Sequence, residues 1–227
     1  MSATPDLVLV GAGGLGRETA AAVRALNSIR PTYTLRGFLD DGLVEGVMVD
    51  GHPVLGPATA DALEQLPDAH VVVCTAGTAD RFSRRRLVAR LGLPDARYAT
   101  VVHPGATIAD DGVPGPGSVV LAAVVTTTDV PIGAHVVIMP ATVLTHDDEV
   151  GDFVTFGAGV RLGGRVSVGT GAYLGAGALV REGCRIGAWS VVGMGAVVLA
   201  SVAAGEVHVG NPARHLRTLA LPEELGG

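Results

Sequence analysis

One apolar residue recurs at every sixth position through the second half of the chain. From position 132 to 198 this phase contains Ile132, Ile138, Leu144, Val150, Phe156, Leu162, Val168, Leu174, Val180, Ile186, Val192 and Val198. Neither the helical period of 3.6 nor the strand period of 2 produces a strict repeat of six. A parallel β-helix does, because each hexad forms one short strand and one corner, and three hexads complete a coil. The repeat therefore predicts a narrow prism with these side chains inside it.

Glycine directly follows most of these apolar residues, as in Ile132-Gly133 and Ile186-Gly187. We expect this small residue to let the chain turn the corner of each coil. The same phase extends back through Val120, Ile108 and Val102, with Thr126 and Pro114 as weaker members. The predicted β-helix therefore covers residues 101–227, including a C-terminal segment that closes it.

Residues 6–99 follow a different pattern, in which short apolar strands alternate with helices. We expect strands at 7–10, 35–39 and 71–75, one helix after the first strand and another at about 80–91. Alternation of this kind is typical of a parallel sheet with right-handed crossovers. Residues 1–100 are therefore predicted to form an α/β, Rossmann-like domain.

The first strand is followed by a glycine-rich loop that opens a helix. Gly11, Gly13 and Gly16 fit the G-x-G-x-x-G pattern, and Asp40 and Asp41 end the next strand, where a dinucleotide site places its ribose-binding acid. A dehydrogenase does not fit, because the residues before the hexads leave no catalytic domain for hydride transfer. The alternative, that the glycines only permit tight packing of strand and helix, stays open.

The hexads resemble the left-handed β-helix acyltransferases, whose signature is an apolar residue, then glycine, then four variable residues. The segment HVGNPARHL, at 208–216, is similar to the one that closes the prism in that family. In the N-terminal half, GAGGLGRE at 11–18, GFLDD at 37–41, PVLG at 53–56 and HP at 103–104 resemble one subgroup. That subgroup is the bacterial sugar acetyltransferases that act on UDP-4-amino sugars or on sialic acid.

The resemblance implies two ligands, a nucleotide-linked sugar and acetyl-CoA as co-substrate. The residues that it assigns to the nucleotide-sugar are Gly13, Gly14, Leu15, Asp40, Asp41 and Gly56. Many relatives carry histidine at the position of Leu15 and a second histidine at that of Thr155, which would contact acetyl-CoA. Gly164 and Ala176 stand where relatives contact the thioester and the pantetheine arm, and the Gly164 N–H is a candidate oxyanion donor.

Ionisable side chains are rare between positions 118 and 145, and then His146, Asp147, Asp148 and Glu149 follow one another. Because Leu144 points inward, we expect His146 to lie outside the prism. Histidine changes charge near neutral pH and suits the removal of a proton from an attacking amine, and an adjacent carboxylate can orient its ring. We therefore predict His146 as the catalytic base and Asp147 as its partner, the position where the resemblance places this pair. Asp148, Glu149 and Asp152 are expected to be surface charges, and a purely solvated cluster remains the alternative.

A zinc site was weighed, because His103, His135 and His146 lie on or near the predicted prism. Zinc needs three ligands that converge on one point, and no tight pair of histidines recurs on neighbouring coils. No metal is therefore expected.

Charge and composition exclude other classes. A net charge of −6 argues against nucleic acid as a partner, and no apolar stretch is long enough to span a membrane. The N-terminus has no basic region typical of a signal peptide, and Cys74 and Cys184 are expected to be reduced core residues, so a cytoplasmic location is expected. The basic run at 84–86 is expected on the solvated side of a helix.

Together these patterns predict an acyltransferase that moves an acetyl group from acetyl-CoA to the amino group of a nucleotide-linked sugar in bacterial glycan biosynthesis. Two alternatives stay open: O-acetylation of sialic acid or another sugar hydroxyl, and a non-catalytic, trimeric scaffold that binds nucleotide-sugars. Val119, Leu121, Val137 and Met139 are expected to leave apolar surface on a monomer. A homotrimer with sites at the subunit boundaries is therefore predicted.

Overall fold

The structure, a computed structural model, describes residues 4–77, 80–110 and 112–221. The chain divides into two compact units, residues 1–104 with 116–121 and residues 105–115 with 122–227. We call them the N-terminal unit and the β-helix unit. Within the described ranges, no helix has the length and apolar character needed to cross a membrane.

The N-terminal unit is built on a five-stranded sheet in the order β3-β4-β2-β1-β5. Its elements are β1 (Asp6–Val10), α1 (Gly14–Ile29), β2 (Thr34–Leu39), β3 (Met48–Val49), β4 (His52–Gly56), η1 (Asp61–Leu63), β5 (His70–Val73), α2 (Ser83–Leu91), η2 (Asp95–Arg97), β6 (Val101–Val102) and β7 (Val119–Val120). The four strands β4, β2, β1 and β5 run parallel, and β3 pairs antiparallel with β4. The expected strands and helices are present, whereas β3 and β4 were not expected.

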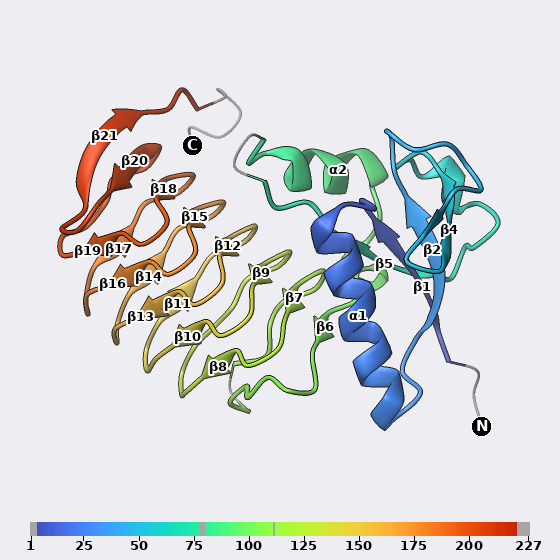
Figure 1. Cartoon of the computed structure of the whole chain (residues 1–227), viewed down its shortest axis with the longest axis horizontal. Coiled ribbons are helices and arrows are strands. Elements are labelled where there is room, and N and C mark those ends of the chain that lie inside the picture. The colour runs from blue at the N-terminus through green and yellow to red at the C-terminus, as the bar shows by residue number, and fades with distance from the viewer. Residues whose placement is uncertain (1–3, 78–79, 111, 222–227) are drawn as a thin grey trace. The chain divides into compact units, whose positions relative to one another are not determined.

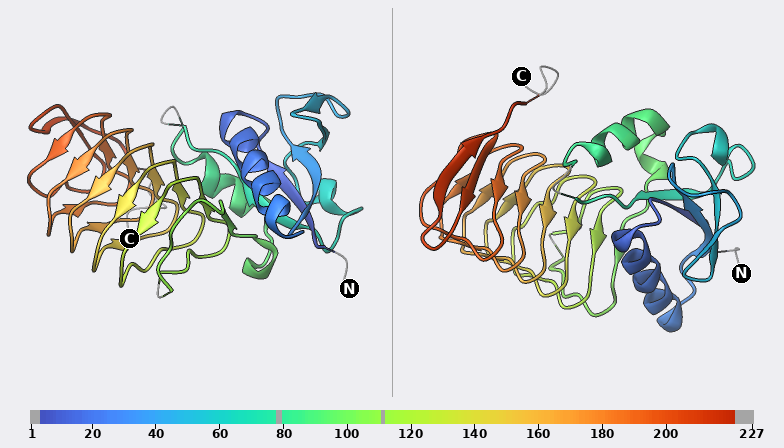
Figure 2. Two further views of the ribbon diagram at one scale, coloured as in Figure 1. Left: turned by 60° about the horizontal axis from the view of Figure 1, so that its bottom comes forward. Right: turned by 45° about the horizontal axis from the view of Figure 1, so that its top comes forward.

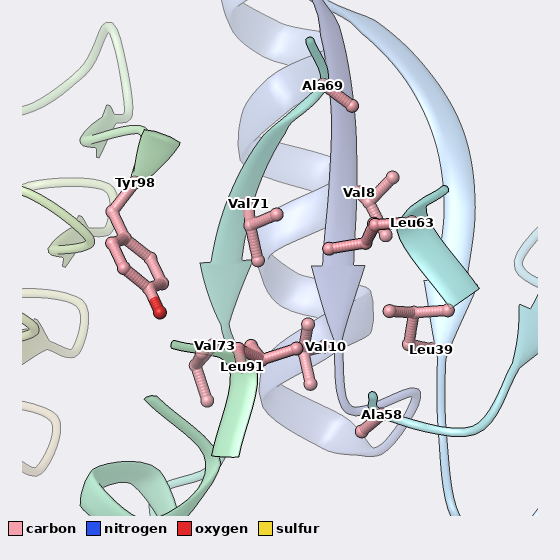
Figure 3. Packing of buried hydrophobic residues seen from close by; sticks show 10 residues of the cluster. All are labelled: Val8, Val10, Leu39, Ala58, Leu63, Ala69, Val71, Val73, Leu91 and Tyr98. Atoms are coloured by element: carbon pink, nitrogen blue, oxygen red, sulfur yellow. The ribbon is translucent and has the colours of Figure 1, made fainter. Parts of the chain in front are cut away.

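Apolar side chains of β1 and β5 form the core of this sheet. Figure 3 shows Val8 and Val10 of β1 beside Val71 and Val73 of β5, with Leu91 of α2 packed into the same cluster. All five are at most 2% exposed. Residues that alternate along a strand point to opposite faces, so the remaining apolar positions of β1 face the other side of the sheet. This double burial explains why the strands are apolar throughout.

The basic run at 84–86 does not lie wholly on a solvated face. Arg84 is only 4% exposed, and its Nη1 atom donates a hydrogen bond to the carbonyl oxygen of Thr75 at 2.7 Å. Burial lowers the pKa of Arg84 to about 10. The expectation of a solvated side chain is therefore wrong for Arg84, because the carbonyl oxygen of Thr75, two residues after β5, gives its guanidinium a hydrogen-bond partner.

The β-helix unit consists mainly of two-residue strands arranged in three sheets, which are parallel except for the longer β20–β21 hairpin (Figure 1). The β10 face contains β8 (Val125–Thr126), β10 (Val143–Leu144), β13 (Arg161–Leu162), β16 (Leu179–Val180) and β19 (Val197–Val198). The β11 face contains β11 (Glu149–Val150), β14 (Ser167–Val168) and β17 (Arg185–Ile186). The β12 face contains β9 (Val137–Ile138), β12 (Thr155–Phe156), β15 (Tyr173–Leu174), β18 (Val191–Val192), β20 (Glu206–Val209) and β21 (Arg214–Thr218). From β9 to β19, consecutive strands visit the three faces in turn, and Figure 2 shows the resulting stack of coils from two further sides.

The hexad prediction is confirmed by burial. All twelve apolar residues of the phase are at most 6% exposed, and Phe156 and Leu144 are fully buried. Paired strands lie eighteen residues apart, as in Val143 with Arg161 and Thr155 with Tyr173. Three hexads therefore complete each coil. The segment at 208–216 contains the turn of the antiparallel β20–β21 hairpin, which pairs through β20 with β18 of the β12 face.

The corners are formed differently from the expectation. The glycine after an inward residue is required by the next coil, since a Cβ at Gly163 would lie 2.7 Å from the backbone nitrogen of Glu182. The left-handed backbone conformation falls instead three residues after the inward position, and non-glycine residues such as Ala141 and Asp147 adopt it with φ of 61° and 62°. Glycine therefore permits close packing of the coils, and the residue in the left-handed conformation lies two residues after the glycine position.

The apolar residues expected on the outside of a monomer are mostly buried within the single chain. Val119 and Val137 are 0% exposed and Leu121 is 4% exposed, while Met139 is half-buried. That expectation is wrong, because these positions are covered within one chain.

Candidate active site

His146 and Asp147 lie at the corner between β10 and β11, outside the prism. Their side chains are 51% and 53% exposed, and His146 Nδ1 lies 2.7 Å from Asp147 Oδ2. An ionised carboxylate only accepts hydrogen bonds, so Nδ1 carries the proton in this pair and the lone pair of Nε2 is left as the basic site. The left-handed conformation of Asp147, with φ of 62°, is one that aspartate tolerates better than most residues. The geometry therefore suits a base oriented by its neighbour.

Gly164 lies at the same corner one coil further along. A Cβ added there would overlap the His146 imidazole ring, so the ring rests directly on the Gly164 backbone. The backbone N–H of Arg165 donates to the carbonyl oxygen of His146 at 3.0 Å and holds the two corners together. Only glycine admits a ring this close. The structure thus brings the predicted base and the predicted oxyanion donor into contact.

Asp148 is not a surface charge, which corrects the expectation. Its side chain is fully buried, and its carboxylate accepts hydrogen bonds from the N–H of Thr145 at 2.7 Å and of Val166 at 2.8 Å. Burial raises the pKa of Asp148 to about 6, against the lowering effect of these two hydrogen bonds and of nearby His146. The sequence signal for this burial is the spacing of eighteen residues that separates Asp148 from the buried Val130 and Val166.

The other two acids of the cluster are exposed, as expected. Glu149 is an outward residue of β11, and Asp152 lies at the next corner. The Asp152 carboxylate accepts a hydrogen bond from the N–H of Ala134 at 2.8 Å. Both lie outside the contact between His146 and Gly164.

Ala176 and Thr155 are not brought to the His146 corner. Ala176 lies between β15 and β16, at the corner where the β12 and β10 faces meet, and it is partly exposed. Thr155 belongs to β12 and is only 6% exposed. The residues assigned to acetyl-CoA are therefore divided between two corners and one face of a single chain.

The glycine loop contains two kinds of glycine. Gly11 has φ of 102°, and a Cβ on Gly16 would overlap the Gly11 carbonyl oxygen, so these two serve packing between strand and helix. Gly13 and Gly14 are exposed, and no atom of the described residues lies within 4 Å of a Cβ placed on either. α1 begins at Gly14 without an acidic residue in its first turn. The helix N-terminus therefore presents open backbone suited to an anion.

The two aspartates after β2 are anchored to the backbone. Asp40 accepts hydrogen bonds from the N–H of Ala12 and of Gly42, at 2.8 and 2.9 Å. Asp41 accepts from the N–H of Ala58 at 2.9 Å and from Arg90 at 2.6 Å, and these bonds lower its pKa, the Arg90 bond most. Asp40 thus ties the glycine loop to the end of β2, and Arg90 is a partner that the sequence did not reveal.

The remaining residues assigned to the nucleotide-sugar lie close to this anchor. Gly56 ends β4, is buried, and accepts the N–H of Asp40 through its carbonyl oxygen at 3.0 Å. Leu15 lies in the first turn of α1 and is partly exposed. The ends of β1, β2 and β4 therefore gather the predicted residues of the N-terminal unit at one edge of the sheet.

The described residues include the three histidines named as candidate zinc ligands. Among the described residues, no group of three histidine, cysteine, aspartate or glutamate side chains is placed to hold a metal ion. His135 instead stacks on Phe153, with ring centroids 5.0 Å apart and planes 12° apart. Cys74 and Cys184 are buried and free, as expected, and burial raises the pKa of the Cys74 thiol to about 12.

Comparison with known proteins found similarity among solved structures. No protein-family model and no curated protein matches the chain. The structure of WeeI from Acinetobacter baumannii is 30% identical, with a TM-score of 0.78, and the match covers 94% of this chain and 100% of that one.

Two further structures carry ligands. The acetyltransferase domain of PglB from Neisseria gonorrhoeae, in complex with acetyl coenzyme A, is 27% identical with a TM-score of 0.82, and the match covers 94% of this chain and 100% of that one. PerB from Caulobacter crescentus, in complex with CoA and GDP-perosamine, is 27% identical with a TM-score of 0.83, and the match covers 95% and 99% of the two chains. The fold of this chain is therefore shared along its length with these proteins.

Proposed function

The chain belongs to the hexapeptide-repeat sugar acetyltransferases, and from this premise we propose that it transfers the acetyl group of acetyl-CoA to the amino group of a nucleotide-linked sugar. The observation that carries the proposal is the contact of His146 with both Asp147 and the Gly164 backbone. A base, its orienting acid and a backbone donor at one corner are the groups that acyl transfer to an amine requires.

The chemistry follows from these positions. Asp147 accepts a hydrogen bond from the Nδ1–H of His146, so Nε2 is free to remove a proton from the sugar amine as the amine nitrogen bonds to the thioester carbonyl carbon. Negative charge develops on the carbonyl oxygen, and the Gly164 N–H stabilises it. The carbon–sulfur bond then breaks, and the CoA thiolate receives the proton from His146. The products are an amide and free CoA.

We propose that the N-terminal unit is a Rossmann-like domain that binds the nucleotide part of the substrate. Gly13 and Gly14 offer open backbone at the N-terminus of α1, where a diphosphate is favoured by the helix dipole. Asp40 and Asp41 retain acceptor capacity beyond their backbone bonds, since a carboxylate has about four lone-pair sites. Their place at the carboxyl ends of parallel strands favours contact with the nucleoside.

We further propose that three copies assemble around the prism. The β10 face joins the corner of His146 and Gly164 to the corner of Ala176, and it carries outward Val125, Val143, Leu179 and Val197. Leu179 remains 40% exposed and the three valines are partly exposed. A neighbouring copy on this face would cover that apolar surface and bring Ala176 of one chain to His146 of another. This arrangement is supported by the positions of Gly164 and Ala176, which are both assigned to acetyl-CoA but lie at different corners of one chain.

Release of free CoA from acetyl-CoA tests the activity. Purified protein would be incubated with a panel of UDP-, GDP- and TDP-linked amino sugars, together with sialic acid as a hydroxyl acceptor. We expect turnover with at least one amino sugar, and a product heavier by one acetyl group in mass spectrometry. Turnover with sialic acid alone would show that the acetyl group is transferred to a hydroxyl and not to an amine. Nucleotide binding without release of CoA would favour the non-catalytic scaffold. His146→Ala serves as the inactive control.

A further inference from the structure

Asp148 occupies a place that the same corner of the neighbouring coils gives to apolar residues. At intervals of eighteen, the same corner position is taken by Val130, Val166, Cys184 and Val202, which are at most 3% exposed. Asp148 is the charged member of this column and is equally buried. Burying a carboxylate costs folding free energy that a valine would not cost. Its presence therefore calls for a role other than packing.

The carboxylate also changes the backbone hydrogen bonding of its coil. In neighbouring coils, the N–H groups of Thr127, Gly163 and Arg181 donate to strand carbonyl oxygens of the next coil at 2.9 to 3.2 Å. At the equivalent Thr145, the N–H donates to Asp148 Oδ2, and the hydroxyl of Thr145 reaches the Leu162 carbonyl oxygen at 3.2 Å. Asp148 thus redirects the backbone at the residue directly before His146.

The second oxygen of the carboxylate reaches the opposing corner. Asp148 Oδ1 accepts from the N–H of Val166, two residues after Gly164. One side chain therefore bonds both the segment that carries the base and the segment that carries the oxyanion donor. With the bond from the Arg165 N–H to the His146 carbonyl oxygen, it fixes the separation of the two corners.

We propose that Asp148 is a positioning residue that holds His146 against Gly164 at the spacing that acetyl transfer requires. The proposal rests on the proposed function of His146 as the base. In this proposal, Asp148 serves activity at the expense of stability, because valine or cysteine packs equally well at the equivalent position of the neighbouring coils.

Asp148→Val separates this role from a structural one. Valine matches the neighbours in the column, and Thr145 can then donate to the strand as its equivalents do. We expect an unchanged or higher melting temperature, a fall in kcat of about 10- to 100-fold, and KM values for acetyl-CoA and the acceptor sugar within about three-fold. Asp148→Asn keeps one acceptor oxygen and should lose less. Asp152→Asn is the matched control, because it removes a carboxylate that also accepts one backbone N–H, away from His146, and kcat should change little.

A second measurement needs no acceptor sugar. The His146 ring lies against the Gly164 backbone, so nuclear magnetic resonance should show a nuclear Overhauser effect between the ring protons and the Gly164 α-protons. We expect this effect to weaken severalfold in Asp148→Val and to persist in Asp152→Asn. In the unmodified chain, the amide protons of Thr145 and Val166 should shift together as the carboxyl protonates, with His146 and Asp147 as the titrating groups beside it.

The outcomes separate the two proposals. An unaltered Overhauser effect in a folded Asp148→Val protein, or wild-type kcat in that variant, overturns the positioning role. If instead His146→Ala retains full turnover, the assignment of the base fails, and the Overhauser effect still reports whether Asp148 sets the spacing of the corners. Loss of folding in Asp148→Val would show a structural role and would also overturn the proposal.

Discussion

The β-helix unit and the N-terminal unit place their candidate functional residues in different relations to their folds. In the β-helix unit every coil repeats the same plan, and the His146 coil departs from it through a buried acid and a redirected backbone bond. In the N-terminal unit nothing repeats, and the candidate residues are loop ends whose side chains and backbone already stabilise the fold, as Asp40 does by bonding Ala12. A change at the first site should therefore affect the rate of the chemical step. A change at the second should affect substrate binding where the backbone is open and stability where it is packed.

The largest effect is expected for the base. Removing a general base typically costs about 10²- to 10⁴-fold in rate, so His146→Ala should lower kcat by that factor with both KM values within a few-fold. Steady-state release of CoA measures it. Glu149→Gln, an exposed acid of the same coil, is the control, and equal activity of the two variants would show that the cluster is only solvated surface.

Gly164→Ala is expected to have the next largest effect on kcat. A Cβ at this position would overlap the His146 ring and displace it from the oxyanion donor, so kcat should fall by about 10²-fold. Gly159→Ala is the matched control, because Ala141 adopts the same left-handed corner conformation and no atom of the described residues lies within 4 Å of the added Cβ. Comparable losses in both variants would indicate a general cost of alanine in the prism.

Asp147→Asn should have a smaller effect than loss of the base. The amide keeps an oxygen that can accept the Nδ1 hydrogen of His146 but removes the charge that stabilises the imidazolium, so we expect about a 10-fold loss of kcat. Measurement of kcat across pH checks it. A loss as large as that of His146→Ala would mean that Asp147 handles a proton itself.

In the N-terminal unit, Gly14→Val should raise the KM of the nucleotide-sugar by about 10-fold and leave the KM of acetyl-CoA unchanged. A ten-fold change is what the loss of one hydrogen bond to the substrate would cause. The reason is that the open backbone at α1 would be covered without disturbing a packed neighbour. Gly16→Ala is its counterpart, because the added Cβ overlaps the Gly11 carbonyl oxygen and should lower the melting temperature instead. If both KM values rise together in Gly14→Val, the loop is only a packing device.

The smallest effect concerns pH and stability. Folding raises the pKa of Asp148 from 3.8 to about 6, so the folded state binds this proton more tightly than the unfolded state. This contribution to stability is present below pH 4 and is lost as the pH rises through 6. Relative to Asp148→Asn, the wild-type melting temperature should therefore fall by a few degrees over this range, and parallel curves would contradict the shift.

The sequence predicted burial correctly where a short repeat, of six residues, marks the buried positions. The inward positions from Ile132 to Val198, and the exposure of His146 after the inward Leu144, follow from counting in sixes. Contact between His146 and Gly164 is not visible at that period, because it arises between residues eighteen apart. The burial of Asp148 is likewise evident only at a spacing of eighteen residues, because the charged residues beside it in the sequence suggest an exposed position.

By itself, the sequence determined the β-helix, the strands around the glycine loop and the exposed place of His146 beside Asp147. The reason is that burial of one residue in six, or of a continuous strand, is a local requirement that each segment shows in its own residues. The tertiary structure alone decided which charges are buried, as for Arg84 and Asp148, and which glycines are packed or open. These depend on the atoms that another coil or strand brings alongside, since a buried charge is stable only where a distant backbone group supplies its hydrogen bond.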